Sequence, residues 1–389
     1  MTVQVQRLAE AEPQQLDFAD DAAAPLEAPA FLREQLITYI GNKRALLPFI
    51  GKGLDYVKKR LNKNRLNCLD LFSGTGVVSR YLKAHANSLV ANDLELYSRI
   101  TNECYLSNAE DIAKNDLDDA ELFLSNYIAA NMAPGFITEL YAPKNEDAID
   151  AADRVFYTRR NAMYLDTARQ GIAKLPKEVQ PYFLAPLIAK ASIHANTSGV
   201  FKGFYKSQHG IGQYGGSGRD ALSRILRDIY ICQPIFSRFS CTVAVHQEDA
   251  NVFVKNYSGP TFDVAYLDPP YNQHPYGSNY FMLNLLAEYK RPQAISRVSG
   301  IPVDWNRSKY NQKGEAEEAL LDVINSCSSK FIMLSYNSEG FVPHEHFLSG
   351  LQKIGRLITL ETPYNTFRGC RNLCDRPIHV TEFLYLLEK

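Results

Sequence analysis

The sequence predicts an α/β protein with a doubly wound, largely parallel β-sheet and an inserted, mostly helical domain. Short apolar runs alternate with segments of helical spacing from residue 67 to residue 108 and again after residue 241. Such alternation is typical of parallel sheets covered by helices. Residues 109–240 break it with helical patterns and a long glycine-rich stretch. We therefore assign residues 35–108 and 241–389 to one α/β domain and residues 109–240 to an insertion.

Two apolar runs predict the first strands of this domain. Residues 67–72 (NCLDLF) are followed by S-G-T-G and then by VVSRYLKA, which predicts a strand, a glycine turn and a helix. Residues 88–91 form the next run, which ends in Asn92-Asp93 before a second helical segment. Both expected strands therefore end in a polar turn.

Five later runs complete the predicted sheet. They are residues 242–246, 262–267, 330–336, 357–362 and 381–387. The second of these strands must stop at its end, because Pro269 and Pro270 lack the backbone N–H that a sheet ladder requires.

The composition indicates a soluble globular protein of a reducing cytoplasm. Of the 389 residues, 46% are hydrophobic, which is enough for a sizeable core. No apolar stretch reaches about 18 residues, so we expect no membrane span. Residues 1–34 are rich in Ala, Gln, Pro and acids and lack an apolar core, so we expect a disordered leader and no signal peptide. Seven cysteines, an odd number, do not indicate a disulfide framework.

A zinc site is the alternative interpretation of some cysteines. His344, His346, Cys370 and Cys374 could supply four ligands, but the H-x-H and C-x3-C spacings match no standard zinc site. We expect these side chains at core and surface positions, and we expect no bound metal.

The charge distribution indicates a polyanionic partner. The net charge is −1, yet residues 154–227 contain twelve Lys or Arg against three acids, an excess of nine positive charges. Such segregation is expected where a surface meets nucleic acid. A solvated helical face would give the same pattern, so both interpretations stay open at this point.

The most informative stretch is YLDPPY, residues 266–271. Asp268, the Pro269 carbonyl and Tyr271, stiffened by Pro270, predict a rigid corner of acceptors beside an aromatic face, which suits an amino group. A plain strand-to-loop turn would use the same residues. A metal ligand at Asp268 fits less well, because such sites recruit further carboxylates and none stands beside it here.

A nucleoside cofactor is indicated at three strand ends. The glycine turn can bring backbone N–H groups close to a ligand, although D-L-F-S-G-T-G lacks the full G-x-G-x-x-G spacing. Asp93 follows Asp70 by about 23 residues, where an acid can accept hydrogen bonds from ribose hydroxyls. Asp249 ends a third run, where an adenine amino group or a plain surface position would suit it. Lys43 could meet a carboxylate.

In combination these motifs resemble the D12 class, or alpha group, of adenine-N6 DNA methyltransferases. The similarity covers most of residues 36–389, and the insert also resembles restriction-modification methylases of that class. The motifs that carry it are Y-I-G-N-K-R (39–44), D-L-F-S-G-T-G (70–76), N-D (92–93), A-N-T-S-G-V-F-K-G-F-Y-K (195–206), Q-E-D (247–249) and D-P-P-Y (268–271).

The resemblance implies a Rossmann-like, S-adenosylmethionine-dependent methyltransferase that acts on double-stranded DNA. The cofactor would contact Tyr39, Gly41, Lys43, Asp70, Phe72, Gly74, Gly76, Asp93 and Asp249. Residues 109–240 would read the DNA target, with Lys202, Lys206 and Arg219 as contacts. Such an enzyme would work on the bacterial nucleoid in the cytoplasm. The sequence leaves open whether a cognate restriction endonuclease accompanies it.

The resemblance also gives the D-P-P-Y corner a use. The exocyclic amine of adenine is a poor nucleophile, because its lone pair is delocalised into the ring. If Asp268 and the Pro269 carbonyl each accept one N6–H, the nitrogen is polarised and its lone pair faces the methyl group. The base must first leave the duplex, and Tyr271 could stack on it. The alternatives are methylation of cytosine N4, methylation of an RNA base or of protein glutamine, and a catalytically silent DNA-binding module. The large insert favours DNA.

Overall fold

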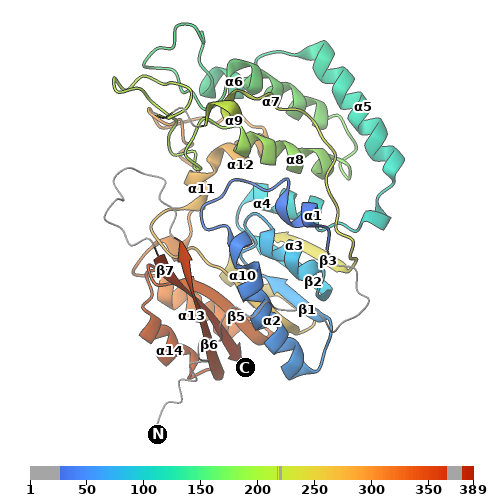
Figure 1. The fold of residues 1–389 in the computed structure, drawn as a ribbon, viewed down its shortest axis with the longest axis vertical. Helices are drawn as coiled ribbons and strands as arrows, with labels where there is room; N and C mark the ends of the chain where they lie inside the picture. The colour runs from blue at the N-terminus through green and yellow to red at the C-terminus, as the bar shows by residue number, and fades with distance from the viewer. Residues whose placement is uncertain (1–26, 217, 219–220, 366–378) are drawn as a thin grey trace.

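The computed structural model describes residues 27–216, 218, 221–365 and 379–389. A sheet forms one part of the molecule, and a layer of helices lies beyond its end (Figure 1). The strands are β1 (Leu66–Asp70), β2 (Ala86–Asp93), β3 (Thr242–Gln247), β4 (Phe262–Leu267), β5 (Ser329–Asn337), β6 (Arg356–Asn365) and β7 (His379–Glu388). Each strand predicted from an apolar run is present, with ends that differ by a few residues at most.

The strand order is β3-β2-β1-β4-β5-β7-β6. β1 to β5 pair in parallel, while β7 lies antiparallel between β5 and β6. The predicted fold class, a doubly wound and largely parallel sheet, is confirmed. Asp70 lies opposite both Ala91 of β2 and Tyr266 of β4, so the carboxyl ends of these three strands meet at one edge.

Helices cover both faces of the sheet. Side chains alternate along each strand, so each strand contributes to the packing on both faces. In β4, Val264 and Tyr266 pack with α2 and α3, whereas Ala265 and Leu267 pack with helices of the opposite face. The helices around the sheet are α1 (Pro29–Arg33), α2 (Leu47–Leu61), α3 (Val77–Lys83), α4 (Leu96–Tyr105), α10 (Ala250–Asn256), α13 (Ala316–Ser326) and α14 (His344–Leu351).

The inserted residues form the helical layer, as expected, but they share its core with other segments. Leu124, Leu165 and Ile188 pack in one cluster with Phe281 of α12 and Phe31 of α1. The layer therefore includes two helices from beyond residue 240. Its helices are α5 (Lys114–Asn131), α6 (Phe136–Tyr141), α7 (Arg159–Ile172), α8 (Gln180–Ile193), α9 (Leu222–Leu226), α11 (Tyr276–Asn279) and α12 (Phe281–Glu288).

Part of the basic excess of the insert is used inside the protein. Arg169 donates to the carbonyls of Leu286 and Ala287, both at 3.0 Å, in the last turn of α12. Arg224 donates to carbonyls at the end of α8 and just beyond, including that of Ala195 at 2.8 Å. Carbonyls at helix ends lack intrahelical partners, so these two arginines are structural clamps.

The expectation of disorder over residues 1–34 is wrong for residues 29–33. Residues 29–33 form α1, and Phe31 is fully buried. The buried Arg80 guanidinium donates to the carbonyls of Phe31 and Glu34 at 2.8 and 3.0 Å. A buried arginine needs such acceptors, and this explains why the segment is held. Residues 1–26 lie outside the described part of the chain.

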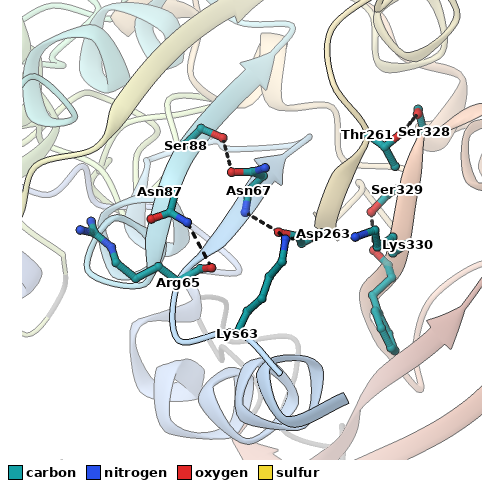
Figure 2. Close-up of polar contacts among 11 residues, drawn as sticks. Lys63, Arg65, Asn67, Asn87, Ser88, Thr261, Asp263, Ser328, Ser329 and Lys330 are labelled. Carbon is teal, nitrogen blue, oxygen red and sulfur yellow. Dashed lines mark hydrogen bonds and ion pairs between the residues drawn. The ribbon is translucent and has the colours of Figure 1, made fainter. Parts of the chain in front are cut away.

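A buried carboxylate joins the amino ends of three strands, opposite the edge where β1, β2 and β4 end (Figure 2). Asp263 of β4 lies 2.8 Å from Lys63 Nζ and 3.2 Å from Lys330 Nζ of β5. It also accepts a hydrogen bond from the Asn67 N–H of β1 at 3.0 Å. Hydrogen bonds from Lys63, Asn67 and Lys330 lower the pKa of Asp263, although burial alone would raise it.

The alternative zinc site receives no support from the histidines that the structure describes. His344 Nδ1 lies 2.7 Å from the Tyr385 hydroxyl, and His346 pairs with Glu317. Cys370 and Cys374 lie outside the described residues. Within the described ranges, no group of three or more His, Cys, Asp or Glu is placed to hold a metal ion, and no helix has the length and apolarity to cross a membrane.

Candidate active site

A cleft at the carboxyl ends of β1, β2 and β4 gathers most of the predicted site residues. Ligands of open parallel sheets bind at this edge. The predicted residues that line it are Tyr39, Gly41, Lys43, Asp70, Phe72, Gly74, Asp93, Asp249, Asp268 and Pro270. Gly76, Pro269 and Tyr271 adjoin lining residues in sequence.

The turn after β1 needs its glycines. Gly74 and Gly76 have φ values of +50° and +74°, which other residues rarely adopt. A Cβ on Gly76 would also lie 2.7 Å from Asn102 Oδ1. The Gly74 N–H donates to Asp93 Oδ2 at 2.8 Å, so the turn and the end of β2 fix each other.

Two acids at the ends of β1 and β2 are held in unfavourable surroundings. Ser79 Oγ donates to Asp70 Oδ2 at 2.6 Å, while Asp70 Oδ1 is buried with no hydrogen-bond partner among the described residues. Burial raises the pKa of Asp70 to about 7. Burial also raises the pKa of Asp93 to about 6, although hydrogen bonds from the N–H groups of Glu95 and Gly74 lower it. A ligand that brings donors or positive charge would stabilise both carboxylates.

Asp249 has a local structural role at the third strand end. Its Oδ1 accepts from the Asn251 N–H at 3.0 Å and the Val252 N–H at 3.2 Å, which caps helix α10. Asp249 also lines the cleft. Its proposed contact with an adenine amino group stays a prediction.

One wall of the cleft was not predicted from the sequence. Burial raises the pKa of Glu95 to about 7, and this carboxylate accepts from Asn284 Nδ2 at 2.5 Å and Asn306 Nδ2 at 3.0 Å. Tyr310 packs edge-on against Phe72, with ring centroids 5.0 Å apart. Glu95 could have been found because it stands two residues after Asp93. The segment around Asn306 and Tyr310 carries no comparable signal.

The D-P-P-Y corner stands at the end of β4, which stops at Leu267 as the prolines require. The Asp268 side chain is 20% exposed, and burial raises its pKa to about 6 although Lys43 opposes the shift. Pro269 is buried, whereas Tyr271 is half-buried and meets Tyr336 edge-on at 6.1 Å. The carboxylate is therefore both accessible and largely ionised at neutral pH.

Lys43 differs from its expected setting. The resemblance assigned it to a cofactor carboxylate, but its ammonium lies 3.3 Å from Asp268 Oδ1 and 2.5 Å from Glu382 Oε1. Burial alone would lower the pKa of Lys43, yet these two carboxylates hold it well above its ordinary value. Lys43 lines the cleft, so it can reach a ligand only with an ammonium that already serves two acids.

A stack of tyrosines joins the Y-I-G-N-K-R motif to the segment after the corner. The Tyr39 ring is stacked with Tyr276 at 4.8 Å and with Tyr280 at 4.4 Å. The Ile40 N–H donates to the Tyr280 hydroxyl at 2.7 Å. Gly41, with φ of +77°, then turns the chain toward Lys43.

The predicted DNA contacts lie on a loop that begins beside the corner. The Phe201 N–H donates to the Asn279 carbonyl of α11 at 2.7 Å. Lys202 and Lys206 are exposed, and Lys206 pairs with Gly212 in a short antiparallel bridge. Arg219 lies outside the described residues.

Fold and site together define the class of protein. A parallel α/β sheet carries a glycine turn, acids at the next strand ends and a D-P-P-Y corner around one cleft. This combination defines a methyltransferase that uses a methyl donor of the S-adenosylmethionine type.

Comparison with known proteins gives the family. The chain belongs to the D12 class of N6 adenine-specific DNA methyltransferases, whose family model matches residues 39–348. It is 27% identical over 365 residues to the type II methyltransferase M.NlaIII of Neisseria lactamica, across 91% of this chain and 99% of that protein. It is 26% identical over 345 residues to M.CviAII of Paramecium bursaria Chlorella virus 1, across 86% and 93%.

A third relative is longer. The chain is 27% identical over 369 residues to the modification methylase StsI of Streptococcus sanguinis, across 90% of this chain and 52% of StsI. The resemblance seen in the sequence is therefore confirmed. The chain is a site-specific DNA methyltransferase that acts on N6 of adenine.

Proposed function

We propose that S-adenosylmethionine binds in the cleft and that a flipped adenine is methylated on N6 while its amino group contacts Asp268. The observation that carries this proposal is the position of Asp268 in the same cleft as the glycine turn and Asp93. Cofactor and amino group would thus meet at the ends of adjacent strands. When bound, S-adenosylmethionine supplies an electrophilic methyl group.

The cleft fits the cofactor chemically. Asp70 Oδ1 lacks a partner among the described residues and suits the ammonium of the methionine part. Asp93 suits ribose hydroxyls, as acids at this position do in related folds. Phe72 and Tyr310 offer aromatic surface next to Asp249, where the adenine of the cofactor would lie.

Asp268 would act on the amino group of the target base. Its carboxylate accepts one N6–H and the Pro269 carbonyl accepts the other, which orients the nitrogen lone pair. The N–CH₃ bond forms as the S–CH₃ bond breaks, and the surplus N6 proton leaves through Asp268 or water. A preorganised acceptor of this kind strengthens as positive charge develops on the nitrogen.

Substitution of Asp268 tests this assignment. We expect Asp268→Ala to lower the single-turnover rate about a hundredfold or more while S-adenosylmethionine and DNA affinities change little. With labelled cofactor, wild-type enzyme should leave the label on adenine N6, read by mass spectrometry of nucleosides. A variant that keeps its rate would refute the role of Asp268, and label on cytosine N4 would refute the base assignment.

We also propose that the helical domain, residues 109–240, reads the DNA target. Lys202 and Lys206 support this, because their loop starts at the hydrogen bond between Phe201 and Asn279 beside the corner. The duplex must lie close to this loop for a base to reach the cleft. Phosphate contacts by such lysines would hold the duplex in place.

A second loop extends the proposed DNA-binding surface around Lys202 and Lys206. Residues 290–313 hold six Lys or Arg and one acid, and they form a hairpin through a bridge between Ile295 and Pro302. The Tyr141 hydroxyl donates to the Gly300 carbonyl at 2.7 Å, which fixes the hairpin to the helical domain. Arg297 and Val298 are exposed at its tip, and the segment continues into Asn306 of the cleft.

The relatives motivate one biological proposal. StsI is named a modification methylase and M.NlaIII a type II methyltransferase, so this enzyme would protect one DNA sequence against a restriction endonuclease in the cytoplasm. Single-molecule sequencing of DNA from cells that express it should show one methylated motif. Methylation without sequence preference would contradict this role.

A further inference from the structure

A buried triad of charges links the D-P-P-Y corner to the last strand of the sheet. The Lys43 ammonium lies between Asp268, just after β4, and Glu382 in β7. Lys43 and Glu382 are only 6% and 1% exposed. Ser335 Oγ of β5 donates to Glu382 Oε1 at 2.9 Å. Residues from three distant parts of the chain therefore meet behind Asp268.

Glu382 is the best-fixed member of the triad. It lies opposite Asn337 of β5 and Thr362 of β6, so its backbone is held by strands on both sides. Its oxygen lies closer to the Lys43 ammonium than Asp268 does, 2.5 Å against 3.3 Å. Lys43, by contrast, is in a short 3₁₀ turn, Lys43–Leu46. The strand thus determines where the ammonium lies.

We propose that Glu382 is a positioning residue for methyl transfer: it holds Lys43, which in turn fixes and orients the Asp268 carboxylate. This inference rests on the proposed role of Asp268. Removing one partner from a buried charge network leaves the others poorly compensated. Without Glu382, the Lys43 ammonium would shift toward Asp268. The Asp268 carboxylate would then lose the orientation in which it accepts a hydrogen bond from the amino group.

A role in cofactor binding is the competing explanation. If Lys43 instead served a cofactor carboxylate, loss of Glu382 would weaken S-adenosylmethionine binding and leave the rate at saturation unchanged. If Glu382 only stabilised the fold, its loss would lower thermal stability alone. The three roles therefore predict changes in different measurements.

The test compares Glu382→Gln with Glu388→Gln. Glu388 lies on the same strand and pairs with Arg60, but at the far end from the cleft. We expect Glu382→Gln to slow single-turnover methylation about tenfold to a hundredfold, the usual effect of a small misplacement at a reacting centre. Cofactor and DNA affinities should stay within about twofold, and the Glu388 variant should match wild type in rate.

The pH profile gives a readout that a structural role would not move. Activity should fall as Asp268 is protonated near its pKa of about 6, which the Glu382 charge raises and Lys43 lowers. Glu382→Gln should therefore move the acidic limb to lower pH, and Lys43→Met should move it to higher pH. The other titratable groups that face this network are Asp70, Tyr266, Tyr271, Tyr276 and Tyr364.

The outcomes separate the two proposals. If Asp268→Ala keeps its rate, the proposed function fails and the role of Glu382 fails with it. If Asp268→Ala is inactive but Glu382→Gln has the rate and pH profile of the Glu388 variant, only the role of Glu382 fails. A weaker cofactor affinity at an unchanged rate also overturns it. Should Glu382→Gln fold poorly, Glu382→Asp keeps the charge but retracts the oxygen, and a normal rate there would contradict the proposal.

Discussion

At the residue scale, the cleft depends on carboxylates that the fold holds away from water. Asp93 uses both oxygens on backbone N–H groups, Oδ2 toward Gly74 and Oδ1 toward Glu95. Each oxygen keeps further acceptor capacity, which a ribose could use. Asp93 would therefore bind the cofactor and hold the glycine turn at the same time.

Substitution of Asp93 tests both functions. In Asp93→Asn, one acceptor becomes a donor that faces a backbone N–H, so we expect S-adenosylmethionine affinity to fall about tenfold or more. DNA affinity measured without cofactor should not change. Calorimetry provides the measurement, with Asp55→Asn on the exposed side of α2 as control. Equal cofactor affinity in the two variants would exclude a role for Asp93 in the site.

The acids at strand ends were predictable from the sequence, whereas Glu382 was not. Asp70 ends β1, and Asp93 and Asp268 end or follow apolar runs, so the geometry of parallel sheets brings them to one edge. Glu382 lies inside a strand, and its partner Lys43 stands 339 positions earlier. Glu382 reaches Lys43 only because β7 lies antiparallel next to β5. No local sequence pattern encodes the pairing of these two strands.

At the element scale, the strands are bound differently at their two ends. The carboxyl ends carry the cleft, whereas Asp263 joins the amino ends of β1, β4 and β5 (Figure 2). Asp263 and Asp268 are five positions apart along the chain, about 16 Å in an extended strand. Stability and chemistry should therefore be separable along β4.

Removing both lysines around Asp263 tests this separation. In Lys63→Met with Lys330→Met, a carboxylate that is 2% exposed loses both counter-charges, and we expect a loss of about 3 kcal/mol in unfolding free energy. The exposed pair Lys255–Asp322 is the control, because Lys255→Met should cost less than about 1 kcal/mol. Urea unfolding measures both. Methylation rates at low temperature should match wild type, and a large rate loss would show that the two ends are coupled.

The pH dependence of this contribution has a defined sign. The pKa of Asp263 is lowered in the folded protein, so its stabilisation is present above the ordinary aspartate pKa. It is lost as the pH falls through the folded value. The lysine variant should consequently lose less stability than wild type on acidification.

The strands were predictable because most are apolar runs with a polar end, although β3 and β6 are only partly buried. The prolines after Asp268 marked the end of β4. The order of the strands was not predictable. β7 lies between β5 and β6, and the periodicity of a sequence does not indicate which strands pair. Helix α12 was also missed, because FMLNLLAE is apolar almost all round. Its burial against α4 and α8 follows only from the assembled helical layer.

At the scale of the whole molecule, the basic residues of the helical domain have different uses. Arg169 and Arg224 are clamps on helix ends, whereas Lys202 and Lys206 are exposed on a loop beside the corner. Composition alone shows the excess of positive charge but not this distinction, because it does not reveal which cations bind backbone carbonyls. The DNA surface should therefore be narrower than residues 154–227.

The salt dependence of DNA binding tests that surface. A triple variant of Lys202, Lys206 and Arg297 to Ala removes three exposed charges from two neighbouring loops, which are joined by the hydrogen bond from Ser299 to the Lys202 carbonyl. If each cation contacts a phosphate, the slope of log affinity against log salt should flatten by about 2 to 3 units.

The matched control replaces Lys114, Lys174 and Lys177, which are exposed lysines of the same helical domain away from these loops. Its slope should equal that of wild type, since the slope depends on how many counterions the DNA releases at phosphate contacts and not on net charge alone. Equal slopes in both triple variants would place the duplex elsewhere, and flattening in the control alone would assign the DNA to the outer helices rather than to the loops beside the cleft.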